Sequence, residues 1–271
     1  MVIAHVAAHT ERIRLGAGGV MLPNHSPLVI AEQFGTLETL HPGRIDLGLG
    51  RAPGTDQPTM LAMRRDHTSA DAFPQDVQEI QGYLSGDTRV PGVNAIPGIG
   101  TDVPLYILGS SLYGATLAAA LGLPYGFASH FAPDALEEAV AIYRDRFKPS
   151  RQLDAPHVIA GVNVLVAESD EDAQAQLLSS KRSRASLFFG RGRTLTDEEA
   201  DAALASPQGR HLEAMMRYTA AGTPDTVKAD LDRFVEYTDA DELIVVPHSP
   251  GIDARLRSLE LLADLWGLNP R

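Results

Sequence analysis

Apolar and polar positions change their period repeatedly along the chain. Six short runs have the composition of buried strands, and a segment with apolar residues at helical spacing follows each of them. The predicted strands begin at Ile13, Ile45, Val103, Pro124, His157 and Glu242. Strands that alternate with helices form parallel sheets, because a parallel pair needs a long crossover connection. The pattern therefore predicts an α/β fold with a parallel sheet.

Capping residues mark several of the predicted helices. Ser26-Pro27 precedes a helix expected at 28–40, Ser169 opens the helix after the fifth strand, and Thr223-Pro224 precedes a helix that ends near 237. Helical periodicity also begins at the first residues with no capping residue ahead of it, as though the chain started within a helix. Between about 182 and 222 the periodicity weakens, and we interpret this stretch as an insertion.

The number of strands suggests an incomplete barrel. A closed (β/α)8 barrel has eight strands in about 250 residues, or roughly 30 residues for each strand–helix unit. About six strands in 271 residues therefore predict a TIM-barrel-type fold that lacks two units ahead of Met1. An open doubly wound sheet is the alternative architecture. We interpret residues 1–271 as a single, N-terminally truncated barrel domain with the insertion at about 182–222.

Charge and composition exclude several classes of function. The chain has 23 basic and 35 acidic side chains, and its formal charge of -12 repels nucleic-acid phosphates and anionic lipids. It has no cysteine, which excludes disulfides, thiolate metal sites and cysteine nucleophiles. Neither a signal peptide nor a membrane span is legible at the N-terminus. We expect a cytoplasmic protein that binds neither nucleic acid nor membranes.

Glycines occur inside the first predicted strand, where residues 16–19 read Gly-Ala-Gly-Gly. Glycine weakens a strand unless the backbone must bulge or something flat must lie against it. A barrel kink without any ligand is the alternative explanation. The run is therefore a candidate resting place for a planar ring.

Two further strand ends carry candidate anion-binding residues. Arg51 follows the second strand, and its guanidinium suits a phosphate or carboxylate. Ser110 and Ser111 stand at a helix entrance, where free amide groups and the helix dipole favour an anion. A solvent-facing arginine and an ordinary helix cap are the alternatives. Because ligands collect at the carboxyl ends of parallel strands, the three ends together predict a planar, phosphorylated ligand.

These stretches resemble the bacterial-luciferase-like family of flavin-dependent monooxygenases. The resemblance rests on residues 13–16, 22–27, 43–51, 109–111, 122–124 and 241–246, and so extends over nearly the whole chain. It implies an eight-stranded barrel that binds FMN. The arginine and the serine pair would hold the phosphate. The ring would lie on a bulged strand, which is the third strand of the family's barrel and the first predicted strand of this chain. The cofactor-binding residues implied here are Ala17, Gly18, Gly19, Arg51, Ser110, Ser111 and Ser129. A cis peptide bond between Gly18 and Gly19 is also implied.

The resemblance implies a reaction as well. Reduced FMN from a separate flavin reductase and O₂ would oxidise a small organic substrate, such as an aldehyde or another carbonyl compound. Family members are often homodimers, but no interface is legible in the sequence. An F420-dependent reductase of the same fold, or a non-catalytic flavin-binding protein or inactive remnant, is the alternative.

The catalytic pair of the family has no counterpart in this sequence. The family carries a polar pair, often with histidine, after its second strand, and that strand is absent from this sequence. His130 and His25 are the remaining candidate catalytic residues, and a structural or exposed loop histidine is the alternative for each. The other histidines have no metal-ligand spacing, so no metal site is expected.

Overall fold

The computed structural model describes residues 1–52 and 56–268, which fall into two compact units. The first unit comprises Met1–Gly126 and Ala141–Pro156, and the second comprises Phe127–Val140 and His157–Arg271. Pro53 and Gly54, in the loop expected after the second strand, lie outside the described residues. The interpretation of residues 1–271 as a single domain stays a prediction.

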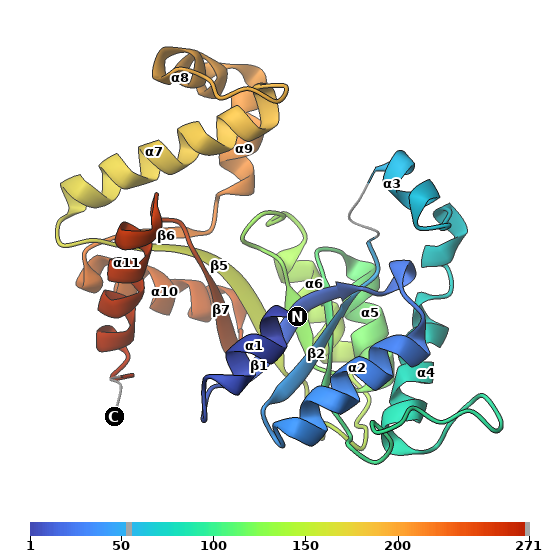
Figure 1. Ribbon diagram of the computed structural model, residues 1–271. Coiled ribbons are helices and arrows are strands. Elements are labelled where there is room, and N and C mark those ends of the chain that lie inside the picture. Colours follow the sequence, from blue (N-terminus) through green and yellow to red (C-terminus); the bar gives the residue numbers. More distant parts are fainter. Residues whose placement is uncertain (53–55, 269–271) are drawn as a thin grey trace. The chain divides into compact units, whose positions relative to one another are not determined.

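Parallel strands form the centre of the first unit. β1 (Leu15–Met21) pairs with β2 (Ile45–Gly50), β2 pairs with β3 (Leu105–Gly109), and the short β4 (Tyr125–Phe127) comes next in the sheet. The helices around them are α1 (Val2–Ala8), α2 (Pro27–Leu40), α3 (Gln57–Ala62), α4 (Phe73–Ser85) and α5 (Leu112–Leu121), with 3₁₀ turns at Leu22–Asn24 and His67–Ala70. Figure 1 shows α1 beside β1 and α2 beside β2.

The apolar side chains of β2 and β3 form the core of this unit. Leu47, Leu49 and Ile107 are completely buried, as expected for strands covered by helices on the outer face of a parallel sheet. Among the described residues β1 has β2 as its one strand neighbour, so the sheet does not close into a barrel.

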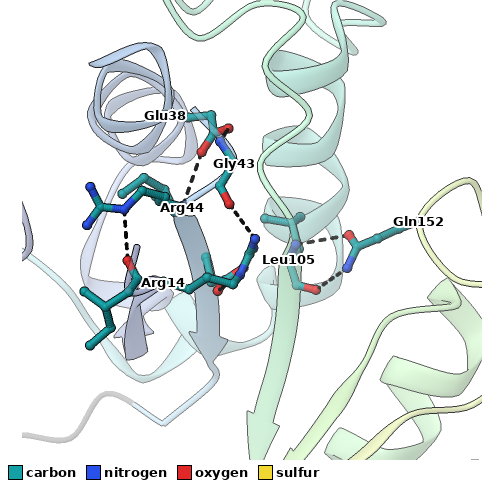
Figure 2. Close-up of polar contacts among 9 residues, drawn as sticks. Arg14, Glu38, Gly43, Arg44, Leu105 and Gln152 are labelled. Carbon is teal, nitrogen blue, oxygen red and sulfur yellow. Dashed lines mark hydrogen bonds and ion pairs between the residues drawn. The ribbon is translucent and has the colours of Figure 1, made fainter. Parts of the chain in front are cut away.

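Polar side chains form hydrogen bonds to the backbone at the amino ends of these strands (Figure 2). The Glu38 carboxylate accepts from the backbone N–H groups of Gly43 and Ile45, at 2.5 and 3.3 Å. Arg44 donates to the carbonyl of Ile13, and the side-chain amide of Gln152 both donates to and accepts from the Leu105 backbone, at 2.9 and 3.0 Å. These contacts lie at the end of the strands opposite to the carboxyl ends, so we assign them a structural role.

The second unit is also built on parallel strands. β5 (Val158–Val166) pairs with both β6 (Thr219–Gly222) and β7 (Glu242–Pro247). Its helices are α7 (Asp170–Phe189), α8 (Asp197–Ala205), α9 (Pro207–Met215), α10 (Pro224–Thr238) and α11 (Ile252–Leu265), while α6 (Leu136–Arg146) has residues in both units. Figure 1 shows α8 and α9 packed at one end of the long α7. Within the described part of the chain, no helix combines the length and apolar character needed to cross a membrane.

All six predicted strands are confirmed, and the stretch 182–222, where the sequence pattern weakens, forms regular elements; its interpretation as an insertion stays a prediction. α7 continues to Phe189, and α8 and α9 follow. Residues 219–222 form β6, a strand in addition to the six that were predicted. Arg182 pairs with Asp197 and Asp201, which joins α7 to α8. The prediction for Ser26 needs a correction. Ser26 is the N-cap residue of α2, but its side chain makes no capping hydrogen bond.

Candidate functional site

β1 departs from regular pairing at its glycines. Its register with β2 shifts between Ala17 and Val20, so the predicted bulge is present at Gly18 and Gly19. The Gly18–Gly19 peptide bond is cis, as the family resemblance implied. Both glycines are exposed at this bulge.

The two glycines have different surroundings. A Cβ atom added to Gly18 would meet no atom within 4 Å. A Cβ atom added to Gly19 would lie 2.7 Å from Cδ1 of Leu108 and 2.9 Å from the carbonyl oxygen of Gly48. Gly19 therefore has a packing role of its own, whereas the space beside Gly18 is open to a ligand.

Arg51 lies beside the helix start that carries the serine pair. Gly50 is aligned with Leu108 across β2 and β3, so the segments that follow these two strands emerge next to each other. The Arg51 guanidinium carbon lies 4.1 Å from the centre of the Tyr113 ring, in the first turn of α5. A guanidinium stacked on a ring keeps its in-plane N–H groups free. Among the described residues no carboxylate pairs with Arg51, so these donors are available to an anion.

The serine pair presents free hydroxyl groups. Ser111 is the N-cap residue of α5, but its side chain makes no capping bond, and both Ser110 and Ser111 are exposed. The backbone carbonyl of Ser111 instead accepts from the Tyr125 hydroxyl at 3.0 Å, which fixes the turn between β3 and α5. The first amide groups of a helix have no partner within the helix. Hydroxyls and amides therefore point to one anion-binding position.

The remaining predicted residues are placed separately. His25 follows the 3₁₀ turn after β1 in the first unit and is exposed. Ser129 and His130 belong to the second unit. The Ser129 side chain is completely buried, and its hydroxyl donates to the carbonyl of Gly161 at 2.6 Å. The structure thus brings Gly18, Arg51 and the serine pair into one unit, while the roles of His25, Ser129 and His130 stay predictions.

A polar cluster in the second unit was missed in the sequence. Nδ1 of His248, directly after β7, lies 2.9 Å from the Ser180 hydroxyl on α7. Burial and the nearby charges of Arg184, His130 and Arg255 lower the pKa of His248 to about 4. Burial, and then Arg184, also lower the pKa of His130. Both imidazoles are therefore neutral near pH 7.

The low pKa of His248 predicts a loss of stability in acid. Between pH 6.5 and about 4 the unfolded chain binds a proton at this residue that the folded protein excludes. The free energy of unfolding should therefore fall as pH falls through this window, by about 1–2 kcal/mol after allowance for solvent screening. Urea unfolding at pH 7 and pH 4.5 measures the change, which should be smaller in His248→Asn than in the control His5→Asn. Equal losses in the two variants would contradict the prediction.

Comparisons with known proteins show the family and the fold. A sequence model of the family described as luciferase-like monooxygenase matches residues 1–241. A luciferase-like monooxygenase of Escherichia coli K12 is 45% identical over 269 residues, which cover 98% of this chain and 80% of the relative. The crystal structure of apo-MsnO8 superposes with a TM-score of 0.87 at 36% identity, covering 100% of this chain and 82% of that one.

A more distant structure shares the fold alone. It is the oxygenating constituent of 3,6-diketocamphane monooxygenase from Pseudomonas putida, a type II Baeyer–Villiger monooxygenase in complex with FMN. The TM-score is 0.67 at 17% identity, over 96% of this chain and 82% of that one. The mostly parallel sheet with alternating helices is thus of the kind found in luciferase-like TIM-barrel monooxygenases.

Proposed function

Because the chain belongs to the luciferase-like monooxygenase family, we propose that it is an FMN-dependent monooxygenase that uses O₂ to oxidise a small organic substrate. One observation supports a phosphate-bearing flavin. Arg51 stacks on Tyr113 beside two free serine hydroxyls at the start of α5. This set of donors suits a phosphate, which FMN carries at the end of its side chain.

The residues of the first unit fit the two ends of the cofactor. The phosphate would take N–H groups of Arg51, the hydroxyls of Ser110 and Ser111, and backbone amides of α5. The ring would lie against the β1 bulge at Ala17 and Gly18, where no side chain occupies the space. We keep Ser129 of the second unit as a further proposed contact.

The protein would contribute binding, orientation and proton transfer. Reduced FMN, delivered by a separate flavin reductase, supplies the electrons for O₂ chemistry when bound. A neutral imidazole can accept a proton, and the lowered pKa of His130 keeps it in this form at neutral pH. We propose His130 and the exposed His25 as the groups that move this proton.

Cofactor binding and oxygen consumption test the proposal. FMN and F420 are titrated separately into the purified protein while their fluorescence is recorded, because an F420-dependent reductase of Methanopyrus kandleri shares the fold at 20% identity. We expect FMN to bind, and reduced FMN with O₂ and an aldehyde to yield the carboxylic acid or another oxygenated product. Binding of F420 alone would favour a hydride-transfer reductase. FMN binding without any oxygenated product across aldehydes and ketones would favour a non-catalytic flavin-binding protein.

A further inference from the structure

We propose that Arg184 of the second unit binds an anionic group of the substrate, a carboxylate or a sulfonate. Arg184 lies on α7, and its charge acts on His130 and on His248, which Ser249 follows in the chain; we call these four residues the Arg184 cluster. Binding of an anion here does not depend on the proposed function. The identification of that anion as part of the substrate does rest on it.

Arg184 differs from the other arginines around it. Its Nη1 atom is buried and has no hydrogen-bond partner in the described part of the chain. Arg182, on the same helix, pairs with two aspartates, and Arg193 pairs with Glu199. Within residues 1–52 and 56–268 no carboxylate pairs with Arg184. Among the described residues, Arg184 is thus a partly buried cation with no acidic partner and with no hydrogen-bond acceptor at Nη1.

Two neutral groups of the cluster also have buried polar atoms without a partner among the described residues. Nδ1 of His130 and the hydroxyl of Ser249 are buried without partners, and the Ser249 side chain is only 1% exposed. The His130 ring lies against the β5 backbone, where a Cβ atom on Gly161 would be 2.4 Å from Nδ1. A buried polar group without a partner is costly, because it has lost its hydrogen bonds to water. An anion bound at Arg184 would give its Nη1 group a hydrogen-bond acceptor.

The charge of the cluster selects the kind of ligand. Two neutral imidazoles and the Arg184 guanidinium, with Arg255 near His248, give a net positive site; burial comes first among the causes that keep both imidazoles unprotonated near pH 7. Planar N–H groups of arginine match the oxygens of carboxylates and sulfonates. Arg51 and the serine pair already provide a position for the flavin phosphate in the first unit. The Arg184 cluster is therefore assigned to the substrate.

The two imidazoles report on an anion beside Arg184. Protein labelled with ¹³C-histidine is titrated by NMR across pH with and without propionate, methanesulfonate or inorganic phosphate. An anion that offsets the Arg184 charge should raise the pKa of both His130 and His248, by about one at saturation. Propionate and methanesulfonate distinguish a carboxylate from a sulfonate. An unchanged pKa with all three anions would overturn the proposal.

Variants locate the binding group. Arg184→Gln should raise the pKa of both imidazoles without any anion and remove the response to added anion. Arg182→Gln is the matched control, because Arg182 is on the same helix and already paired, and it should respond like the unaltered protein. If an added anion still raises the pKa of the two imidazoles in Arg184→Gln, the assignment of the site to Arg184 is contradicted.

Flavin binding separates the substrate from the cofactor. FMN and riboflavin affinities are measured for Arg184→Gln, and both should stay within about twofold of the unaltered protein, a change of roughly 0.4 kcal/mol. A loss of FMN affinity with riboflavin affinity unchanged would assign the cluster to the flavin phosphate instead. If neither flavin binds even the unaltered protein, the proposed function fails, while the anion response still tests the cluster.

Discussion

Gly19→Ala is expected to destabilise the first unit, whereas Gly18→Ala is not. The added methyl group at residue 19 would lie 2.7 Å from Cδ1 of Leu108 and 2.9 Å from the carbonyl oxygen of Gly48. The leucine side chain can move, but the carbonyl belongs to the β2 backbone. Overpacking of this kind costs about 1–3 kcal/mol. Urea unfolding of the two variants measures the difference.

The same pair of variants tests where the flavin ring lies. A methyl group at residue 18 meets no protein atom within 4 Å, so stability should be unchanged. If the ring rests on this backbone, the methyl group would occupy its place and weaken FMN binding by about tenfold, or 1.4 kcal/mol. Equal FMN affinity in Gly18→Ala and the unaltered protein would place the ring elsewhere. Equal stability of Gly18→Ala and Gly19→Ala would contradict the packing role of Gly19.

Arg51→Gln is expected to weaken FMN binding by roughly 10- to 100-fold. The change removes charge-assisted hydrogen bonds to the phosphate, each worth about 1.5–3 kcal/mol. Riboflavin, which has the same ring but no phosphate, should bind the variant and the unaltered protein equally well. Fluorescence titrations with both flavins measure the two affinities.

Two controls make this result specific to the site. Arg12→Gln alters an exposed arginine before β1 and should leave both affinities unchanged. Tyr113→Leu removes the ring that supports the guanidinium and should cause a smaller loss for FMN than Arg51→Gln. A parallel loss of riboflavin affinity in Arg51→Gln would mean that the arginine acts on the fold instead of the phosphate.

The strands with a strong apolar pattern were predictable from the sequence. β2 begins at the predicted Ile45, because its buried apolar side chains give the strand a clear pattern. β6 was missed because Thr219–Gly222 consists of small residues without an apolar period. The length of α7 was missed because few apolar side chains on it are buried, with Ala173 and Ala185 as its buried residues. α8 carried a usable signal in the capping box of Thr196 and Glu199.

The residues of the candidate site were predictable from the sequence, but the contacts between them were not. Arg51 and the serine pair follow strands, so the rule that ligands collect at strand ends found them. The stacking of Arg51 on Tyr113 depends on the register of β2 and β3, which no local pattern encodes. His248 also follows a strand and could have been selected by the same rule. Arg184 lies near His248 because α7 packs on β5 and β6 of the same unit, an arrangement that no local sequence pattern encodes.

A crystal structure of the protein with bound FMN tests the central claim most directly. We expect the phosphate within hydrogen-bond distance of Arg51, Ser110 and Ser111, with the ring against the backbone of Gly18. A phosphate bound at Arg184, or a ring bound away from the β1 bulge, would contradict the account.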